Sequence, residues 1–292
     1  MVDTNRNTAG LIELPKPISD EIWTKTQEAS VVQTLARQIN MPAAGMQIPV
    51  ITGDAEAEWV GETEEKPVSQ SEFGSKTLRP YKLAVIEMFS DEFERDMGAV
   101  YNALVQRLPV ALGRKFDLTA LGFLDSPGTG FDTLAGAPSV VLDGEGVGGY
   151  FDALSGVTAA DGDIEAWALS PQAEIDAMRV QDGNGNPMLI SNYTTDVQIG
   201  SILARPAWRS RHVEGTAGEE NVIGFAGEWS SAMWGFVDGI SIDINRNGTV
   251  RKDGQDYHLW QRNMFAVRAE VEIGFAVRDP NRFAKLVRPS GA

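Results

Sequence analysis

The most informative stretch of the sequence is Phe265-Ala-Val-Arg-Ala-Glu-Val-Glu-Ile-Gly-Phe-Ala-Val277. Every second residue in it is apolar, which is the pattern of a β-strand with one buried face. Strands of globular proteins usually contain about five or six residues, whereas this one would span about 40 Å. So long a strand is expected to pack against an element of similar length elsewhere in the chain.

A helix that begins at Ser90 is the predicted neighbour of this strand. The Ser90 hydroxyl can accept a backbone N–H, and acidic residues follow directly, where the helix dipole favours negative charge. Apolar residues then recur at spacings of three and four as far as Phe123, and Pro109 predicts a kink. We expect a helix of roughly 30 residues, about 50 Å long, that ends before Pro127 and packs against the long strand.

The N-terminal part predicts an arm, a short helix and two strands. Residues 1–20 show little periodicity and form the expected arm. An amphipathic helix follows, capped by Ser19 and Asp20 and closed by Pro42 and Gly45. The two strands are expected over residues 46–50 and 82–89.

A polar segment rich in Glu, Ser, Gly and Lys joins these two strands. Its length of about 30 residues is unusual for a loop. It is either a disordered insertion or a long hairpin that leaves the body and packs on a neighbour. Trp59 and Phe73 favour the hairpin, because large aromatic side chains are good anchors at interfaces. With Glu62, they are candidate contacts between subunits.

Short elements separated by turns are expected over residues 128–237, which are rich in Gly, Asp and Ala. Helices are predicted near residues 150–154 and 171–178, the second capped by Ser170. Buried strands are predicted over residues 164–169 and 221–226, and a strand with one wet face over residues 240–244.

The composition limits the possible functions. The chain has 292 residues, 42% of them hydrophobic, with no cysteine and a net charge of -16. The absence of cysteine excludes disulfides, thiol nucleophiles and cysteine metal sites. Strong negative charge opposes tight binding to the nucleic-acid backbone. No secretion signal or membrane-spanning stretch is found, so we expect synthesis in a cytoplasm and no membrane contact.

No residue set predicts a catalytic, cofactor or metal site. The two histidines, His212 and His258, are isolated in the sequence and are interpreted as surface or interface residues. The loop Gly144-Glu-Gly-Val-Gly-Gly149 departs from the dinucleotide spacing, and its glutamate would repel a pyrophosphate. The segment Asp182-Gly-Asn-Gly-Asn-Pro187 begins like a calcium loop, but proline replaces the required glycine. We interpret both as turns.

One basic cluster stands out in this acidic chain. Arg205, Arg209 and Arg211 surround Trp208. Such a cluster could touch nucleic acid or a carboxylate of a neighbouring subunit. The overall charge favours the subunit contact, so these four residues complete the candidate contacts.

The order and spacing of several motifs resemble the tailed-phage major capsid proteins of the Hong Kong 97 type. The resemblance extends from about residue 15 to about residue 290. It rests on Ile22-Trp23, Glu28-Ala-Ser30, Pro49-Val50, Ala57-Glu-Trp-Val-Gly-Glu62, Lys82-Leu83, Ser90-Asp-Glu-Phe93, Asp182-Gly-Asn-Gly-Asn-Pro187 and the long strand itself.

This resemblance implies an α+β structural subunit and not an enzyme. It implies an N-terminal arm with a short helix over residues 1–45 and an extended hairpin, the E-loop, over 46–89. A peripheral domain with a long "spine" helix covers 90–129 plus 239–292, and an axial domain covers 130–238. Subunits of this kind form pentamers and hexamers that close into an icosahedral shell around double-stranded DNA.

The expected partners follow from the same resemblance. They are further copies of the chain, a portal, a candidate decoration protein, and DNA through loose contact only. Family members often begin with a cleaved scaffolding segment, which here was either removed or is replaced by a separate scaffolding protein. The expected location is the virion. Although Lys66 and Lys76 lie in the hairpin, no matching asparagine and catalytic carboxylate can be placed, so we predict no covalent cross-link between subunits.

Two alternatives remain open from the sequence. An encapsulin-like shell would have the same fold and would package protein cargo. A nucleotide-dependent α/β enzyme would use the loop Gly144–Gly149.

Overall fold

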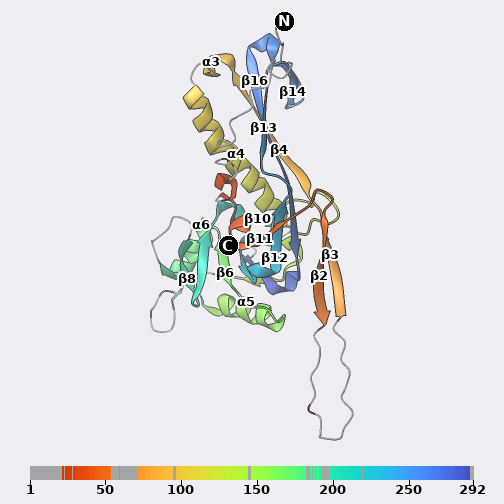
Figure 1. The fold of residues 1–292 in the computed structure, drawn as a ribbon. Coiled ribbons are helices and arrows are strands. Elements are labelled where there is room, and N and C mark those ends of the chain that lie inside the picture. The colour runs from red at the N-terminus through yellow and green to blue at the C-terminus, as the bar shows by residue number, and fades with distance from the viewer. Residues whose placement is uncertain are drawn as a thin grey trace.

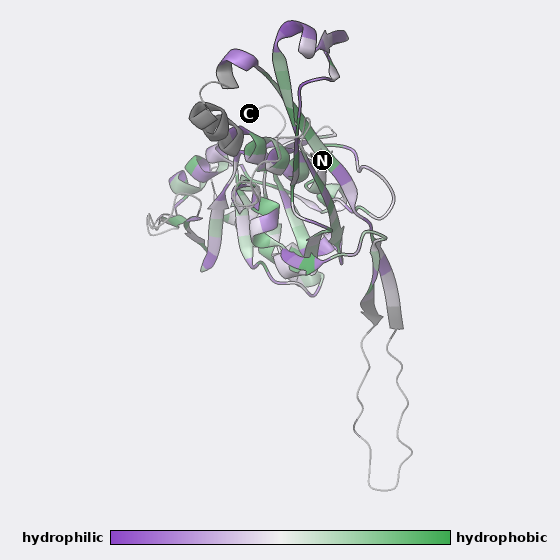
Figure 2. Ribbon diagram, turned by 45° about the horizontal axis from the view of Figure 1, so that its top comes forward, coloured by the Kyte–Doolittle hydropathy of each residue, from purple (hydrophilic) through white to green (hydrophobic). Residues whose placement is uncertain are grey.

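The structure is a computed structural model that describes residues 22, 24–27, 29–53, 59, 72–94, 97–143, 146–181, 185, 187, 189–191, 198–218 and 220–289. For residues 50–53, 72–73, 93–94, 97–106 and 191 it describes the backbone only. Two β-sheets, a long helix and a projecting hairpin make up the fold (Figure 1). Hydrophobic residues gather in the body, while the end that carries β14 is hydrophilic (Figure 2).

The central strand of the five-stranded sheet is β16 (Met264–Val277), which confirms the predicted long strand. It pairs antiparallel with β4 (Tyr81–Ser90) on one side. On the other side it pairs with β13 (Ser241–Asn245) and β12 (Ala232–Phe236), and β1 (Arg37–Asn40) joins parallel to β12. These pairings satisfy the backbone of β16 along its length.

Along β16, more exposed and buried side chains stop alternating near Gly274. From there to Val277 every residue is buried, because the second face of the sheet is covered. A Cβ at Gly274 would lie 2.7 Å from the backbone oxygen of Arg79, and Leu78 and Met41 lie close by. Leu78, Met41 and Ala276 form a small buried cluster. The chain near the base of the hairpin therefore packs on the sheet.

The long helix α4 (Met97–Ala120) packs against β16, as predicted, and follows the short helix α3 (Asp91–Glu94). Leu108 and Leu112 join a buried cluster with β13 and β16, and the Phe116 and Phe275 rings lie 6.1 Å apart. Pro109 lies inside the helix without ending it. The helix ends at Ala120, earlier than the apolar pattern suggested.

Gly122 gives the physical reason for this earlier end. Its φ of +86° lies in the left-handed region, and a Cβ there would meet the backbone nitrogen of Ala135 at 2.6 Å. The chain therefore turns at Gly122. Phe123 then packs on Phe225, with ring centroids 5.9 Å apart, and does not continue the helical stripe.

The eight-stranded sheet is buried on both faces. One face contributes to the cluster shared with α4 and β16, and α5 (Gly148–Ala159) and α6 (Pro171–Arg179) cover the other. The predicted caps and strands of this region are confirmed: the Ser170 hydroxyl accepts from the Ala173 N–H at 3.1 Å. In spatial order the strands are β5 (Ser139–Val141), β17 (Phe283–Val287), β11 (Glu220–Gly227), β6 (Ala166–Leu169), β9 (Arg205–Arg209), β8 (Gln198–Ile202) and β7 (Leu189–Ser191), with β10 (Gly215–Ala217) on β11.

Two hairpins and several short helical turns complete the described chain. The projecting hairpin consists of β2 (Met46–Gly53) and β3 (Glu72–Leu78), and a small one consists of β14 (Thr249–Lys252) and β15 (Gln255–His258). The helical segments are α2 (Val31–Leu35), η1 (Leu134–Gly136), η2 (Arg211–Val213), η3 (Trp229–Ser231), η4 (Trp260–Arg262) and η5 (Pro280–Arg282).

Two local predictions near the N-terminus were wrong. The helix ends at Leu35, and Ile39 belongs to β1, because pairing with β12 satisfies this backbone as a strand. The strand that pairs with β2 in the hairpin is β3, which was not predicted because its sequence is polar. The strand predicted near residues 82–89 is β4, which belongs to the sheet of β16. The described helices include none that is both long and apolar enough to cross a membrane.

Two strands cross the domain boundaries drawn from the sequence. β12 lies within the predicted axial segment, residues 130–238, yet it pairs with β16 of the other sheet. β17 lies within the predicted peripheral segment, residues 239–292, yet it pairs with β11. The chain thus passes between the two sheets more often than a single insertion would require. The division into domains stays a prediction.

Candidate subunit-contact surfaces

The projecting hairpin is held to the body at its base. The Lys76 ammonium donates to Asp132 Oδ2 at 3.0 Å and also to the Val277 carbonyl. Asp132 Oδ2 accepts from the Val277 N–H at 3.1 Å, which ties the pair to the end of β16. Gly45, with φ +77°, allows the chain to enter β2 close to Leu78. The hairpin therefore leaves the body in a defined direction (Figure 1).

The three predicted hairpin contacts differ in what the structure shows of them. Trp59 is fully exposed, at 104% of its reference surface. Phe73 pairs through its backbone with Ile51, and its side chain lies outside the described part. Glu62 lies outside the described residues. An exposed Trp59 buries no apolar surface within its own subunit, so it is available to another molecule.

The predicted basic cluster is divided by the fold. Arg205 turns toward Asp163, with Nη2 2.5 Å from Oδ1, and this hydrogen bond lowers the pKa of the exposed Asp163 carboxyl. Trp208 packs half-buried on the core. Arg209 lies 3.6 Å from Glu174, and Arg211 is exposed. Trp208, Arg209 and Arg211 come together in one groove, while Arg205 does not.

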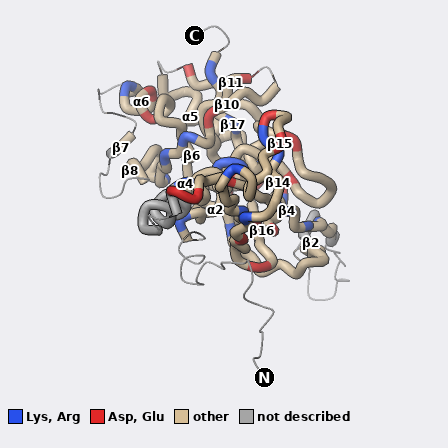
Figure 3. The backbone as a smooth tube through the Cα atoms, turned by 90° about the horizontal axis from the view of Figure 1, so that it is seen from above, with Lys and Arg blue, Asp and Glu red and all other residues tan. Residues whose placement is uncertain are grey.

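This groove, which we call the α2–α4 groove, has a volume of about 280 Å³. It lies where α2 runs beside α4 (Figure 3), with β9 and η2 on its other side. Val110 of α4 is half-exposed at its edge. The lining residues are Ala29, Val31, Thr34, Val110, Trp208, Arg209, Ser210, Arg211 and His212.

A buried carboxylate fixes the floor of the α2–α4 groove. Asp117 of α4 has no exposed surface, and it accepts from the Val31 and Val32 N–H groups at 3.1 and 3.2 Å and from the Ser30 hydroxyl. His212 Nδ1 lies 2.8 Å from the same carboxylate. The His212 tautomer with its proton on Nδ1 matches this geometry, because it can donate to a carboxylate oxygen. Sequence reasoning missed this site, since Asp117 stands within an apolar stripe without any motif.

The exposed face of the five-stranded sheet carries a ladder of charges. Lys82 lies 2.8 Å from Glu270 and 3.5 Å from Glu272, and Arg268 lies 2.5 Å from Asp243. Hydrogen bonding to Lys82 lowers the pKa of Glu270, and the reciprocal bond raises that of Lys82. A groove of about 420 Å³ beside this ladder contains the exposed Ile86.

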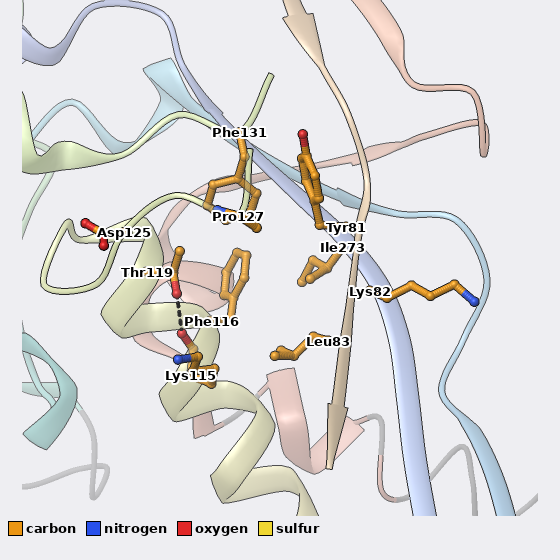
Figure 4. A pocket seen from close by; sticks show the side chains of 10 residues that line it. All are labelled: Tyr81, Lys82, Leu83, Lys115, Phe116, Thr119, Asp125, Pro127, Phe131 and Ile273. Carbon is orange, nitrogen blue, oxygen red and sulfur yellow. Dashed lines mark hydrogen bonds between the residues drawn. The ribbon is translucent and has the colours of Figure 1, made fainter. Parts of the chain in front are cut away.

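An aromatic pocket of about 280 Å³ lies between α4 and β4 (Figure 4). Phe116 and Phe131 form its walls, with ring centroids 6.3 Å apart, and Tyr81 stands edge-on to Phe131 at the same separation. Lys115 and Asp125 stand at its rim, and Lys82 points away from it (Figure 4). Its rim charges are balanced, unlike those of the α2–α4 groove.

The loops that resembled nucleotide and metal sites lie partly outside the described residues, and the calcium-like segment Asp182–Pro187 is described only at residues 185 and 187. The Gly146 N–H donates to Asp143 Oδ1 at 3.2 Å, and Gly144 and Glu145 lie outside the description. Within the described chain, no three His, Asp or Glu side chains converge as metal ligands. His258 faces the Thr249 hydroxyl at 2.8 Å on an exposed hairpin.

Comparison with known proteins identifies the family. A family model described as the phage capsid family matches residues 10–287. The "Probable major capsid protein gp17" of Mycobacterium phage D29 is 31% identical over 284 residues, 91% of this chain and 87% of that protein. A solved chain of Gordonia phage Cozz has a TM-score of 0.69 and 24% identity, covering 89% of this chain and 87% of that one. A solved chain titled as the capsid of an empty GTA particle, computed with C5 symmetry, has a TM-score of 0.64 and 12% identity, covering 90% of each chain. The chain has the Hong Kong 97-type fold and belongs to the phage capsid family.

Proposed function

We propose that the protein is the major capsid subunit of a tailed-phage head and assembles as pentamers and hexamers into an icosahedral shell around double-stranded DNA. The observation that carries this proposal is the hairpin, which is anchored at Lys76 and Asp132 and presents a fully exposed Trp59. A monomer gains nothing from such an element, whereas a shell subunit uses it to reach its neighbour. The family match and the mycobacteriophage relative favour this function over both alternatives.

The presence of two sheets supports a division of the subunit into a peripheral and an axial domain. We assign α4, β13 and β16 to the peripheral domain, at about residues 90–129 plus 239–292; β12 lies outside these bounds and joins this domain through its pairing with β16. The strands of the eight-stranded sheet other than β17 form the axial domain, at about residues 130–238. The E-loop hairpin at residues 46–89 and the arm at residues 1–45 bridge to other copies. In this proposal the role is structural and involves no cofactor.

The partners in this proposal are many copies of the chain, a separate scaffolding protein, a portal and a decoration protein. The net charge of -16 supports loose contact with DNA, because a wall of this charge opposes tight binding to phosphates. The subunit is made in the host cytoplasm and ends in the virion.

Electron microscopy of the expressed protein tests the proposal. Rings and closed shells are expected, alone or with scaffolding protein, and genome-length DNA is expected inside particles from infected cells. A chain that stays monomeric with its scaffold would contradict the capsid function. Shells filled with a protein cargo and free of DNA would support the encapsulin-like alternative.

A further inference from the structure

The α2–α4 groove is built to receive a side chain from outside the subunit. We infer that Trp59 of a second copy, with the acidic residues around it, docks in this groove. This inference rests on the proposed function and names the surface that completes the hairpin. Its support comes from the shape and charge of the groove, the sequence around Trp59, and the positions of both on the subunit.

The groove offers an apolar floor that does not need to rearrange. Val31, Val110 and the half-buried Trp208 line it, and Val110 is 50% exposed although it lies on the helix that packs on the core. Below it, Asp117 holds the start of α2 and His212 in place through four hydrogen bonds. Because this network is buried, the floor is rigid, and a docked aromatic ring would lose little energy to rearrangement.

The edge of the groove is basic in an otherwise acidic protein. The Arg209 side chain is 44% exposed. Arg211 is exposed and makes no ion pair with any residue that the structure describes. Arg114 is also exposed and lies one helical turn beyond Val110, on the same face of α4. Two arginines therefore line the apolar groove, and a third lies one helical turn from its edge.

The segment around Trp59 has the complementary chemistry. Residues 54–65 read DAEAEWVGETEE, with six acidic residues and no Lys or Arg. The tryptophan in the middle supplies the apolar anchor, and carboxylates stand on both sides of it. Interfaces combine a central aromatic anchor with charges that match the partner surface. This segment thus matches the groove in both respects.

The positions of the two surfaces require that the segment come from another copy. In Figure 1 the hairpin leaves from the side of the subunit opposite α4 and points away from the body. A contact between two different surfaces of identical subunits is head-to-tail, and it closes into a ring when the rotation fits. Docking of Trp59 in the groove would therefore link each subunit to the next around a pentamer or hexamer.

The other hollows fit this segment less well. The aromatic pocket carries Asp125 as well as Lys115 at its rim, so its charges do not select an acidic partner. In the groove beside β13, the guanidinium of Arg268 is already bound to Asp243 at 2.5 Å. Among the described hollows, the α2–α4 groove alone joins an apolar floor to an exposed, unpaired arginine.

Photo-cross-linking in assembled shells identifies the contact without assuming its register. Trp59 is replaced by p-benzoylphenylalanine, particles are irradiated, and cross-linked peptides are sequenced. We expect dimers on a denaturing gel whose second peptide contains residues 29–34, Val110 or residues 208–212. The same photoreactive residue at Trp260, which is 78% exposed, should not label the groove. Adducts confined to another surface, adducts to DNA, or no adduct in intact shells would each overturn the inference.

Charge reversal provides an independent readout. The double variant Arg209→Glu and Arg211→Glu should lower the yield of shells at least about tenfold, since it places like charges against the acidic segment. The matched control, Lys252→Glu with Arg262→Glu, changes the net charge equally on another exposed surface. Equal yields for both pairs would contradict the inference. If the wild-type chain forms no shells, the proposed function fails; if it forms shells and these tests fail, only the groove is wrong.

Discussion

Asp117 Oδ2 lies 2.8 Å from His212 Nδ1, deep between α4 and η2, although 95 residues separate the two in the sequence. The same carboxylate also accepts from the N–H groups that begin α2. Three segments from different parts of the chain are therefore joined at a single buried charge. Such a charge is costly to bury unless all its hydrogen bonds are made.

Removing the Asp117 carboxylate should destabilise the subunit strongly. Asp117→Ala leaves two backbone N–H groups, the Ser30 hydroxyl and the His212 ring without their acceptor. We expect the free energy of unfolding of the unassembled subunit to fall by about 3–5 kcal/mol, measured by urea denaturation. The exposed Asp125 provides the control, and Asp125→Ala should change it by less than about 0.5 kcal/mol. Equal effects would show that the buried network contributes nothing.

Breaking the pair at the hairpin base should loosen the hairpin without unfolding the subunit. Lys76 and Asp132 are each about one-third exposed, so Lys76→Met should cost no more than about 1 kcal/mol. Amide exchange at the base of β2 and β3 should nevertheless become faster, because the bonds from Lys76 to Asp132 and to the Val277 carbonyl are lost. Lys82 pairs with Glu270 of β16 and not with the hairpin, so the control variant Lys82→Met should leave amide exchange in the hairpin unchanged. Unaltered exchange in the Lys76 variant would mean that the pair does not orient the hairpin.

Acid should weaken the five-stranded sheet through Glu270. Hydrogen bonding from Lys82 holds the pKa of Glu270 below its ordinary value of 4.5. A carboxyl whose folded pKa is lowered contributes stability above its unfolded pKa and loses it as the pH falls through the folded pKa. We therefore expect the urea concentration at the unfolding midpoint to decrease as the pH is lowered below about 4.5. The decrease should be smaller in Glu270→Gln than in the wild type. Because the pair is exposed to solvent, high salt should reduce the difference between the two proteins.

The pair of Lys82 and Glu270 should also lose its stabilising effect at high pH. Lys82 has a pKa raised above 10.5, so its contribution is present at neutral pH and is lost as the pH rises through the raised value. The difference in urea midpoint between wild type and Lys82→Met should therefore shrink above about pH 10.5. A constant difference across this range would show that the charge of Lys82 is irrelevant.

A side chain at the end of α4 should be strongly destabilising. At Gly122, φ is +86° and a Cβ would meet Ala135 at 2.6 Å, so Gly122→Ala should cost about 2–4 kcal/mol from strain and overpacking. Gly136→Ala is the matched control, because a Cβ at Gly136 meets nothing within 4 Å. Differential scanning calorimetry should show a clear fall in Tm for the first variant only. A similar Tm for both variants would contradict the role assigned to Gly122.

Periodic patterns in the sequence predicted the elements that pack on one face. The alternation from Phe265 to Val277 identified β16, and the stripe after Ser90 identified α4 and its contact with that strand. The same reasoning failed where the backbone is satisfied by pairing alone. β3 reads as a polar segment, and β1 continues a helical pattern, yet both are strands because β2 and β12 lie beside them.

The candidate contacts show the same limit. Trp59 could be identified from the sequence, because a large aromatic residue in a polar segment needs a partner. The grouping of Arg209 and Arg211 with Val110, and the separation of Arg205 from them, could not. These residues meet only after the eight-stranded sheet has packed on α4.

Local sequence is sufficient to predict which segments become long strands and helices, because their apolar periodicity depends only on the spacing of neighbouring residues. The charge of the chain and the aromatic, acidic character of the segment around Trp59 can also be read directly from the sequence. The tertiary structure decided where the hairpin is anchored, which strand returns it, and how Asp117, His212 and the arginines surround a groove. These features depend on contacts between residues far apart in the chain, and such contacts leave no periodic signal in the sequence.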